Sequence, residues 1–174
     1  MFKHLRLSFA AAALAALSIL SAVAPTTADA GASSNYQQNK FIDFFFRGQT
    51  FVAPSTIFIA LATTNGTAAA CGTEVSGGSY TRAPYTSSLA NWAGTQGAGS
   101  TTVSSGTSGQ TSNNSVITFP SPTAAWGSIT SFCAYDSATS GNLLFQAALT
   151  TSKSVNSGDA APSFAISALT YTLN

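Results

Sequence analysis

The stretch Thr56-Ile57-Phe58-Ile59-Ala60-Leu61-Ala62 decides the fold class of this 174-residue chain. All but the first of its residues are apolar, and it is rich in β-branched and aromatic side chains. A short apolar run of this composition is typical of a buried strand. The run follows Pro54, and the sequence beyond that proline has a β pattern to its end.

Six further strands are predicted downstream, separated by residues that are typical of turns. They cover residues 79–85, 115–119, 128–135, 142–149, 163–166 and 169–173. Pro84 marks the first of these as an edge strand or a strand end, because proline cannot donate to a ladder. In the last one, Leu169, Tyr171 and Leu173 alternate with threonines, which predicts one wet face. Many short strands between Gly, Ser, Asn and Pro clusters predict a mainly-β fold, a β-sandwich or a jelly-roll-like domain.

One short helix is predicted at the start of this domain, over residues 34–47. Ser34 can cap it, Gln37 stands in the capping-box position, and Gly48 can end it. Asp43 and Arg47 are spaced for an i,i+4 ion pair. The last turns carry more large apolar side chains than one helix face holds, namely Phe41, Ile42, Phe44, Phe45 and Phe46. Either the helix fills the core of its own domain, or Phe44, Phe46 and their neighbours contact another subunit.

Residues 1–30 have the three parts of a secretory signal peptide. Lys3 and Arg6 supply the positive start, residues 7–24 form an apolar run, and Ala28-Asp29-Ala30 is a cleavage motif. The alternative is an uncleaved membrane anchor, since a run of this length is close to the shortest that spans a bilayer. We therefore expect a signal peptide or anchor over residues 1–30 and a single β domain over residues 31–174. Within the domain, residues 93–115 are almost entirely small and polar, which predicts a flexible loop or a thin polar strand pair.

Charged residues make up only 6% of the chain, against about 25% in an average soluble domain. Beyond residue 30 there are four basic and four acidic residues and no histidine. Without a basic patch, a nucleic-acid partner is not expected. Without histidine, neither a Ser-His-Asp centre nor a histidine zinc site can be built. No carboxylate pair is singled out by its spacing, and Lys153 stands beside a turn. We expect no enzyme activity, no cofactor and no metal site.

Two cysteines and two aromatic residues remain as candidates for a structural or binding role. Cys71 and Cys133 can pair in an oxidising compartment, and a disulfide across so long a loop is worth roughly 4 kcal/mol. The alternative is a buried free Cys133 and an exposed Cys71. Tyr85 and Trp92 can stack on a sugar ring, or they can pack in the core or at a subunit interface.

Several short blocks of sequence carry a resemblance to a known family. They are Pro54-Ser55-Thr56-Ile57-Phe58-Ile59-Ala60-Leu61, Gly72-Thr73-Glu74-Val75-Ser76-Gly77-Gly78-Ser79-Tyr80-Thr81-Arg82, Ile117-Thr118-Phe119-Pro120, Ala125-Trp126-Gly127-Ser128-Ile129-Thr130, Gly141-Asn142-Leu143-Leu144-Phe145 and Ser157-Gly158-Asp159. In this order, from about residue 35 to the C-terminus, the chain resembles small bacteriophage virion proteins of the tail-fibre or minor structural type. The resemblance implies a non-enzymatic β domain, with Trp126 and Phe145 in its core, that assembles with copies of itself or other virion proteins.

Two functions are therefore expected. The first is a phage-type virion subunit, in a tail fibre, a decoration or a minor structure, that works by self-association. Its strands carry few of the charged side chains that prevent pairing between sheet edges, so open edges are expected to pair between copies. The second is an exported bacterial surface module of prophage origin, in the periplasm or outside the cell, that binds a host-surface glycan. Contact with a membrane is expected only if residues 7–24 remain uncleaved.

Overall fold

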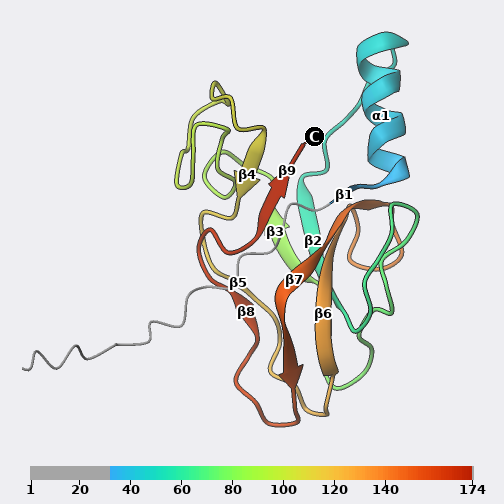
Figure 1. The fold of residues 1–174 in the computed structure, drawn as a ribbon, viewed down its shortest axis with the longest axis vertical. Coiled ribbons are helices and arrows are strands. Elements are labelled where there is room, and N and C mark those ends of the chain that lie inside the picture. Colours follow the sequence, from blue (N-terminus) through green and yellow to red (C-terminus); the bar gives the residue numbers. More distant parts are fainter. Residues whose placement is uncertain (1–31, 174) are drawn as a thin grey trace, which may run out of the picture.

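The computed structural model describes residues 32–173, so the signal peptide or anchor predicted over residues 1–30 lies outside the described residues. A curved antiparallel sheet forms the body of the molecule, and a single helix stands away from one end of it (Figure 1). In the part of the chain that is described, no helix has the length and apolar character needed to cross a membrane.

The main sheet has five strands in the order β1-β7-β6-β2-β3. Its strands are β1 (Ala32–Ser33), β7 (Leu143–Val155), β6 (Gly127–Tyr135), β2 (Thr56–Ala62) and β3 (Ala83–Thr86). Two small sheets complete the body, one of β4 (Gln110–Ser112) with β9 (Thr170–Thr172) and one of β5 (Ile117–Thr118) with β8 (Ser163–Phe164). Every pair of neighbouring strands is antiparallel, so the predicted mainly-β fold is confirmed.

Strand β6 lies at the centre of the main sheet and is buried on both of its faces. Phe132 and Ala134 belong to the larger core, where the Phe132 ring contacts those of Phe145 and Phe164. Cys133 points to the opposite side and packs in a smaller cluster with Ala60 and Leu143. The outer face of the sheet therefore needs a cover of its own.

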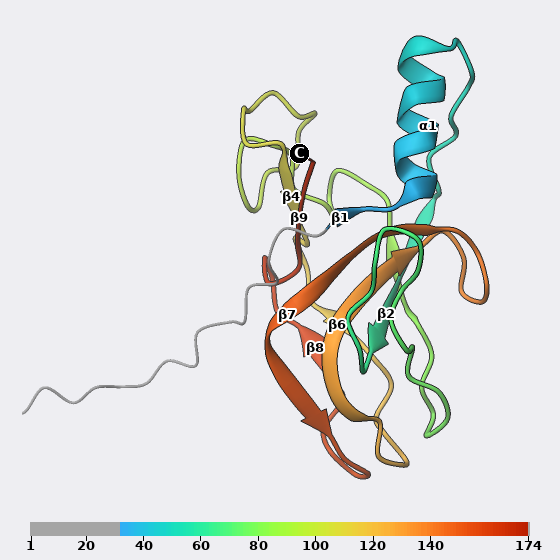
Figure 2. The same ribbon diagram turned by 45° about the vertical axis from the view of Figure 1, so that its right-hand side comes forward.

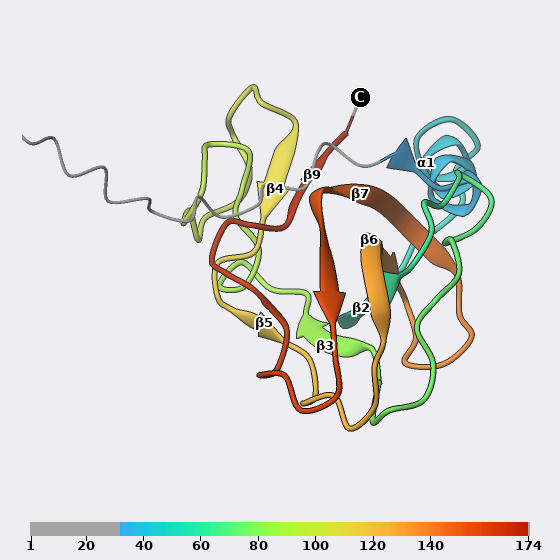
Figure 3. The ribbon, with the colours of Figure 1, turned by 60° about the horizontal axis from the view of Figure 1, so that its bottom comes forward.

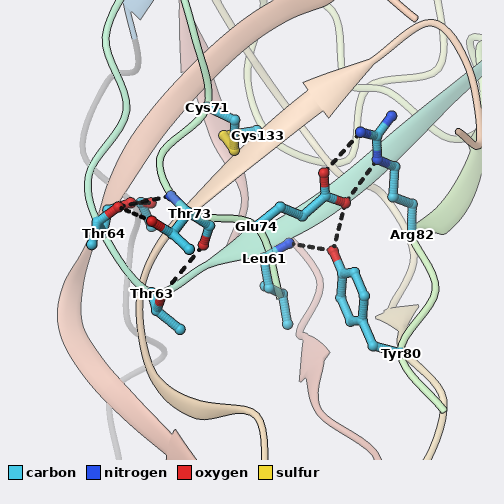
Figure 4. Close-up of a disulfide and its surroundings, with 10 residues drawn as sticks. Leu61, Thr63, Thr64, Cys71, Thr73, Glu74, Tyr80, Arg82 and Cys133 are labelled. Atoms are coloured by element: carbon cyan, nitrogen blue, oxygen red, sulfur yellow. Dashed lines mark hydrogen bonds and ion pairs between the residues drawn. A yellow bond between two sulfur atoms is a disulfide. The ribbon is translucent and has the colours of Figure 1, made fainter. Parts of the chain in front are cut away.

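The connection between β2 and β3 supplies that cover, and a disulfide fastens it to the sheet. Cys71 in this connection is bonded to Cys133 of β6, with their Cα atoms 5.9 Å apart. Next to it, the Thr73 amide donates to Thr64 Oγ1 at 2.7 Å, and the Thr63 hydroxyl donates to the Thr73 carbonyl at 3.3 Å (Figure 4). These bonds hold the two arms of the connection together.

Helix α1 (Asn35–Phe46) begins at the cap that the sequence predicts. Ser34 Oγ accepts a hydrogen bond from the Gln37 amide at 3.0 Å. The Gln37 side chain does not return that bond, because its Oε1 accepts from the Tyr171 hydroxyl at 3.0 Å. The Ser34 amide donates to the Leu144 carbonyl at 2.9 Å instead. The helix is thereby joined at its first turn to both β7 and β9.

The end of α1 also follows from local signals. Arg47 is the C-cap, and its guanidinium forms the expected ion pair with Asp43 at 3.0 Å. Gly48 has a φ of 67°, a left-handed conformation that glycine adopts without strain. The chain then turns back toward the sheet.

The position of α1 contradicts the first of the two alternatives for its apolar side chains and leaves contact with another subunit as a prediction. The helix projects beyond the sheet, and none of its residues is buried (Figure 2). It therefore does not fill the core of its own domain. A helix packs into the core only where a sheet face or another helix is free to receive it, and here the core is already closed by β5, β8 and β9.

The small polar residues 93–115 contain a strand as well as a loop. Residues Gln110–Ser112 form β4, which pairs with β9 near the C-terminus. The preceding loop lies beside this pair (Figure 3) and is held by its own side chains. Ser100 Oγ accepts from the Gly94 amide at 2.7 Å, and Gln96 Nε2 donates to the Val103 carbonyl at 2.6 Å.

The first prediction concerns the disulfide. Replacing Cys71 by serine opens a loop that spans 62 residues, and we expect the free energy of unfolding to fall by about 2–4 kcal/mol. Urea unfolding of the variant and of the parent, each with and without a reductant, measures this loss. The reductant should lower the stability of the parent and leave that of the variant unchanged. Equal stability of oxidised parent and variant would contradict the prediction.

Candidate functional site

The exposed end of α1 is the most unusual surface of the described chain. Four apolar side chains gather there, and we call them the α1 tip: Ile42, Phe44, Phe45 and Phe46. Phe45 is 69% exposed and Phe46 is 84% exposed, while the other two are about half exposed. The Phe44 and Phe45 rings touch edge to face, with their centroids 5.0 Å apart.

The area of this surface equals that of the largest apolar patch on a typical monomeric protein, and such a patch is often functional. The three phenylalanines together expose about two whole side chains, or roughly 300–500 Å² of apolar surface. Contiguous apolar patches beyond a few hundred Å² are rare on monomeric proteins and mark sites of contact with other molecules. The α1 tip is therefore a candidate docking surface.

The base of α1 is held much more firmly than its tip. The Tyr171 hydroxyl is bonded to both Ser33 Oγ and Gln37 Oε1, at 2.5 and 3.0 Å. The Asn35 amide donates to the Ala68 carbonyl at 2.9 Å. Burial raises the pKa of the Tyr171 hydroxyl, and its two hydrogen bonds act in the opposite direction. The hydroxyl therefore stays protonated near neutral pH, so the donor that fixes the helix base persists.

An apolar groove lies beside the base of α1, and we call it the base groove. Its volume is about 590 Å³, and its walls come from α1, from the returning segment before β2, from the segment after β3 and from β7 and β9. The apolar part of its lining includes Tyr36, Phe41, Phe51, Pro54, Ile57, Leu89, Trp92 and Tyr171. Lys40 brings the one charge to the groove, and its ammonium lies 5.5 Å from the centre of the Tyr36 ring.

The predicted contact residues occupy different places. Phe44 and Phe46 lie in the α1 tip. Trp92 lines the base groove and is partly exposed, whereas Tyr85 is buried and donates a hydrogen bond to the Asn91 carbonyl at 2.7 Å. The two rings meet edge to face at 5.1 Å. A molecule on the surface would therefore meet Trp92, and Tyr85 would support it from behind.

The charged pair Glu74–Arg82 forms the most completely bonded polar cluster of the body (Figure 4). The Arg82 guanidinium donates two hydrogen bonds of 2.8 Å to the Glu74 carboxylate. Its third nitrogen donates to the Ser137 and Ser140 carbonyls, and its plane lies 3.6 Å from the centre of the Tyr135 ring. Each of the three guanidinium nitrogens thus has a protein acceptor, so the cluster joins the β2–β3 connection to the turn after β6.

The pKa directions in this cluster agree with a structural role. Burial acts to lower the pKa of Arg82, but its hydrogen bonds to Glu74 and the charge of that carboxylate raise it above its usual value. Burial raises the pKa of Tyr80, whose hydroxyl accepts from the Leu61 amide and donates to Glu74. Both groups keep the protonation state of a structural donor, and neither is poised to transfer a proton near neutral pH.

The remaining candidates for chemistry lie in turns or in solvent. Asp136 accepts from the Asn142 amide and Asp159 from the Asn156 amide, both at 2.7 Å, so each carboxylate closes its own turn. Lys153 is exposed on β7. Among residues 32–173 there is no group of three acidic, cysteine or histidine side chains that could hold a metal ion.

The sequence did not predict two features of the site, the base groove and the Arg82 cluster. The base groove joins segments that are far apart in the sequence, so no local pattern indicates it. The Arg82 cluster has one signal in the sequence: a charged residue that is buried in a predicted strand needs a partner of opposite charge, and Glu74 stands eight residues before it.

Taken together, a disulfide-fastened β body and an anchored helix with an exposed aromatic end are features of a structural protein. Residues 32–172 match the family model described as Podophage GP4 fiber I protein gp80. The chain belongs to this family of phage fibre structural proteins, and its resemblance to bacteriophage tail-fibre proteins is thereby confirmed. Among curated proteins, none matches the chain.

The second prediction concerns Arg82. Its replacement by methionine leaves the Glu74 carboxylate without its charged partner and two carbonyls without a donor, so we expect the free energy of unfolding to fall by about 3 kcal/mol. Arg47→Met is the matched control, because it removes an ion pair whose arginine is 70% exposed, and its effect should stay within about 0.5 kcal/mol. Urea unfolding measures both. Similar losses in the two variants would show that the Arg82 cluster does not hold the body together.

Proposed function

We propose that this protein is a structural subunit of a phage tail fibre and acts by assembly with other protein subunits, without catalysis. One observation carries the proposal: the α1 tip presents large aromatic side chains to solvent from a helix that is fixed only at its base. Membership of the fibre family supports the same role. A place in the virion follows from this role.

Physical chemistry explains why such a tip suits assembly. Phenylalanine is among the residues enriched in the centres of protein interfaces, where burial of its ring removes a large area from water. The α1 tip also lies beyond the outline of the sheet (Figure 2), so another subunit reaches it without displacing any strand. The β body then serves as the rigid support that holds the tip in place.

The third prediction tests assembly through the tip. In the purified full chain we expect an oligomer by size-exclusion chromatography with light scattering. Replacing Phe45 and Phe46 by serine should raise its dissociation constant by at least about a hundredfold, since each of the two buried rings contributes more than about 1.4 kcal/mol. The matched control is Val103→Ser, because Val103 is a similarly exposed apolar residue (74%) on the polar loop. A parent chain that remains a monomer at high concentration would refute assembly of this kind.

A host-surface glycan is the second candidate partner. The observation in its favour is that Trp92 and Tyr36 present aromatic rings to an open groove, where a sugar ring could stack. The polar contacts that sugar hydroxyls need would come from Gln37, Lys40 and Ser88. Most of the lining is apolar, however, which places the glycan second to a protein partner.

The fourth prediction separates these two partners. If the groove binds sugar, a glycan array will show selective binding that Trp92→Ala removes and Val103→Ser retains. If the groove receives protein, the parent, Trp92→Ala and Val103→Ser will all show flat binding across the array, and Trp92→Ala will instead weaken the oligomer.

The intact mass of the purified protein will report in the same preparation whether cleavage has occurred after Ala30.

A further inference from the structure

We infer that a second groove, between β7 and β8, binds a free fatty acid, with its hydrocarbon chain on the core of the molecule and its carboxylate on Lys153. The groove lies at the end of β7 that is farther from α1 (Figure 1), and we call it the β7–β8 groove. Its volume is about 530 Å³, within the range of about 300–1,000 Å³ that is usual for ligand pockets. No residue of the α1 tip or of the base groove lines it, so this site is independent of assembly through α1.

The floor of the β7–β8 groove belongs to the larger core. Five buried apolar side chains form this floor: Leu61, Phe119, Ile129, Val155 and Phe164. The Phe119 and Phe164 rings meet edge to face, with their centroids 6.2 Å apart. A floor of this kind offers no hydrogen bond to a ligand, so the part of the ligand that lies on it must be apolar.

The groove is open because β7 and β8 are not joined by a ladder of hydrogen bonds. They lie side by side (Figure 2), but β8 pairs with β5. Beyond Phe145 and Gln146, the outer edge of β7 has no partner strand among residues 32–173. Alternate residues of a strand share one face, and four alternate residues of β7 line the groove: Leu149, Thr151, Lys153 and Val155. The outer half of β7 therefore forms one wall of the groove and β8 forms the other.

The mouth of the groove is suited to an anion. All the polar side chains that line the groove are exposed, namely Thr151, Ser152, Lys153 and Ser163. Each of them can donate a hydrogen bond, and no carboxylate is among the lining residues. Lys153 is the one charged residue of the groove, and it forms an ion pair with none of the described carboxylates. Hydrogen bonds between an ammonium and a carboxylate are among the strong ones, so the ligand head is expected to be a carboxylate.

The shape of β7 argues against a peptide strand as the occupant. Where β6 advances from Ile129 to Ser131, β7 runs from Lys153 back to Ala148, so several of its residues bulge out of the ladder. A bulge and an exposed lysine both prevent the addition of a further strand. The ligand therefore has no peptide backbone to pair. A sugar is also a poor match, because its hydroxyls would lose their hydrogen bonds to water on the apolar floor. A fatty acid has the apolar chain and the single anionic head that the groove requires.

The fifth prediction uses decanoate as the probe, titrated into the purified full chain by isothermal calorimetry below the concentration at which it forms micelles. We expect a dissociation constant below about 1 mM, because the chain of the probe leaves water for an apolar floor. Decylammonium, which has the same chain and the opposite charge, should bind at least about tenfold more weakly.

Three variants of the full chain locate the site. Lys153→Met should weaken decanoate binding by about tenfold, since it removes the charged donor and keeps a long side chain. Leu149→Ser should weaken it several-fold, since it removes apolar surface from the wall. Lys40→Met is the matched control, because it removes the lysine of the base groove, and it should leave the affinity unchanged. Urea unfolding of each variant shows that it is folded as the parent is.

Several outcomes would overturn the inference. They are no binding of decanoate by the parent, equal binding of decanoate and decylammonium, or an affinity that Lys40→Met lowers and Lys153→Met does not, which would place the probe in the base groove. None of them bears on the proposed function, which the light scattering of the Phe45 and Phe46 variant tests separately.

Discussion

Burial of strand β6 on both faces is the constraint on which the rest of this structure depends. Phe132 and Cys133 are adjacent and fully buried, yet they face opposite sides of the sheet. A strand of this kind is stable only between two layers. One layer is the aromatic core under the sheet, and the other is the β2–β3 connection. That connection has little apolar side-chain surface of its own, so a disulfide and the Glu74–Arg82 pair hold it in place.

Most of the few charged side chains of this chain are used in ion pairs and turns within the fold. The eight charged residues beyond residue 30 are Lys40, Asp43, Arg47, Glu74, Arg82, Asp136, Lys153 and Asp159. Four of them form the two ion pairs, and two aspartates close turns. Few charges are therefore left to solvate the surface, and the polar surface is built from Ser, Thr, Asn and Gln. Such a surface costs less to desolvate than a charged one, which supports the proposed contact with other protein subunits.

The sequence predicts well those elements whose bounds depend on interactions between neighbouring residues. The cap at Ser34, the stop at Gly48 and the Asp43–Arg47 pair place α1 within one residue of its observed bounds. The strands over residues 56–62 and 128–135 were predicted nearly to the residue, because their apolar side chains are buried. The far half of β7 was missed because its Thr-Thr-Ser-Lys-Ser run has no apolar pattern. It is a strand only because β6 lies beside it.

Long-range pairing explains the other differences between sequence and structure. Strand β4 lies within the small polar residues 93–115, and only its pairing with β9, sixty residues away, makes it a strand. The position of α1 is similar in kind. Its apolar side chains predict a contact with other apolar groups. The sequence does not say whether those groups belong to the same chain or to another subunit. That depends on how β5, β8 and β9 close the core, which is a property of the whole fold.

The fold also moves the expected route of self-association from the sheet edges to the helix. Beyond Phe145 and Gln146, which pair with β1, the outer edge of β7 has no partner strand among residues 32–173. That edge is nevertheless poorly suited to pairing, because a register shift interrupts the strand and Lys153 stands on it. Bulges and exposed lysines are the usual means of keeping an edge from adding strands. The α1 tip has no such protection: its rings face solvent with only Asp43 and Arg47 beside them, already paired to each other. Burial of those rings is therefore the larger gain open to the molecule, which supports the proposed assembly through α1 over growth of the sheet.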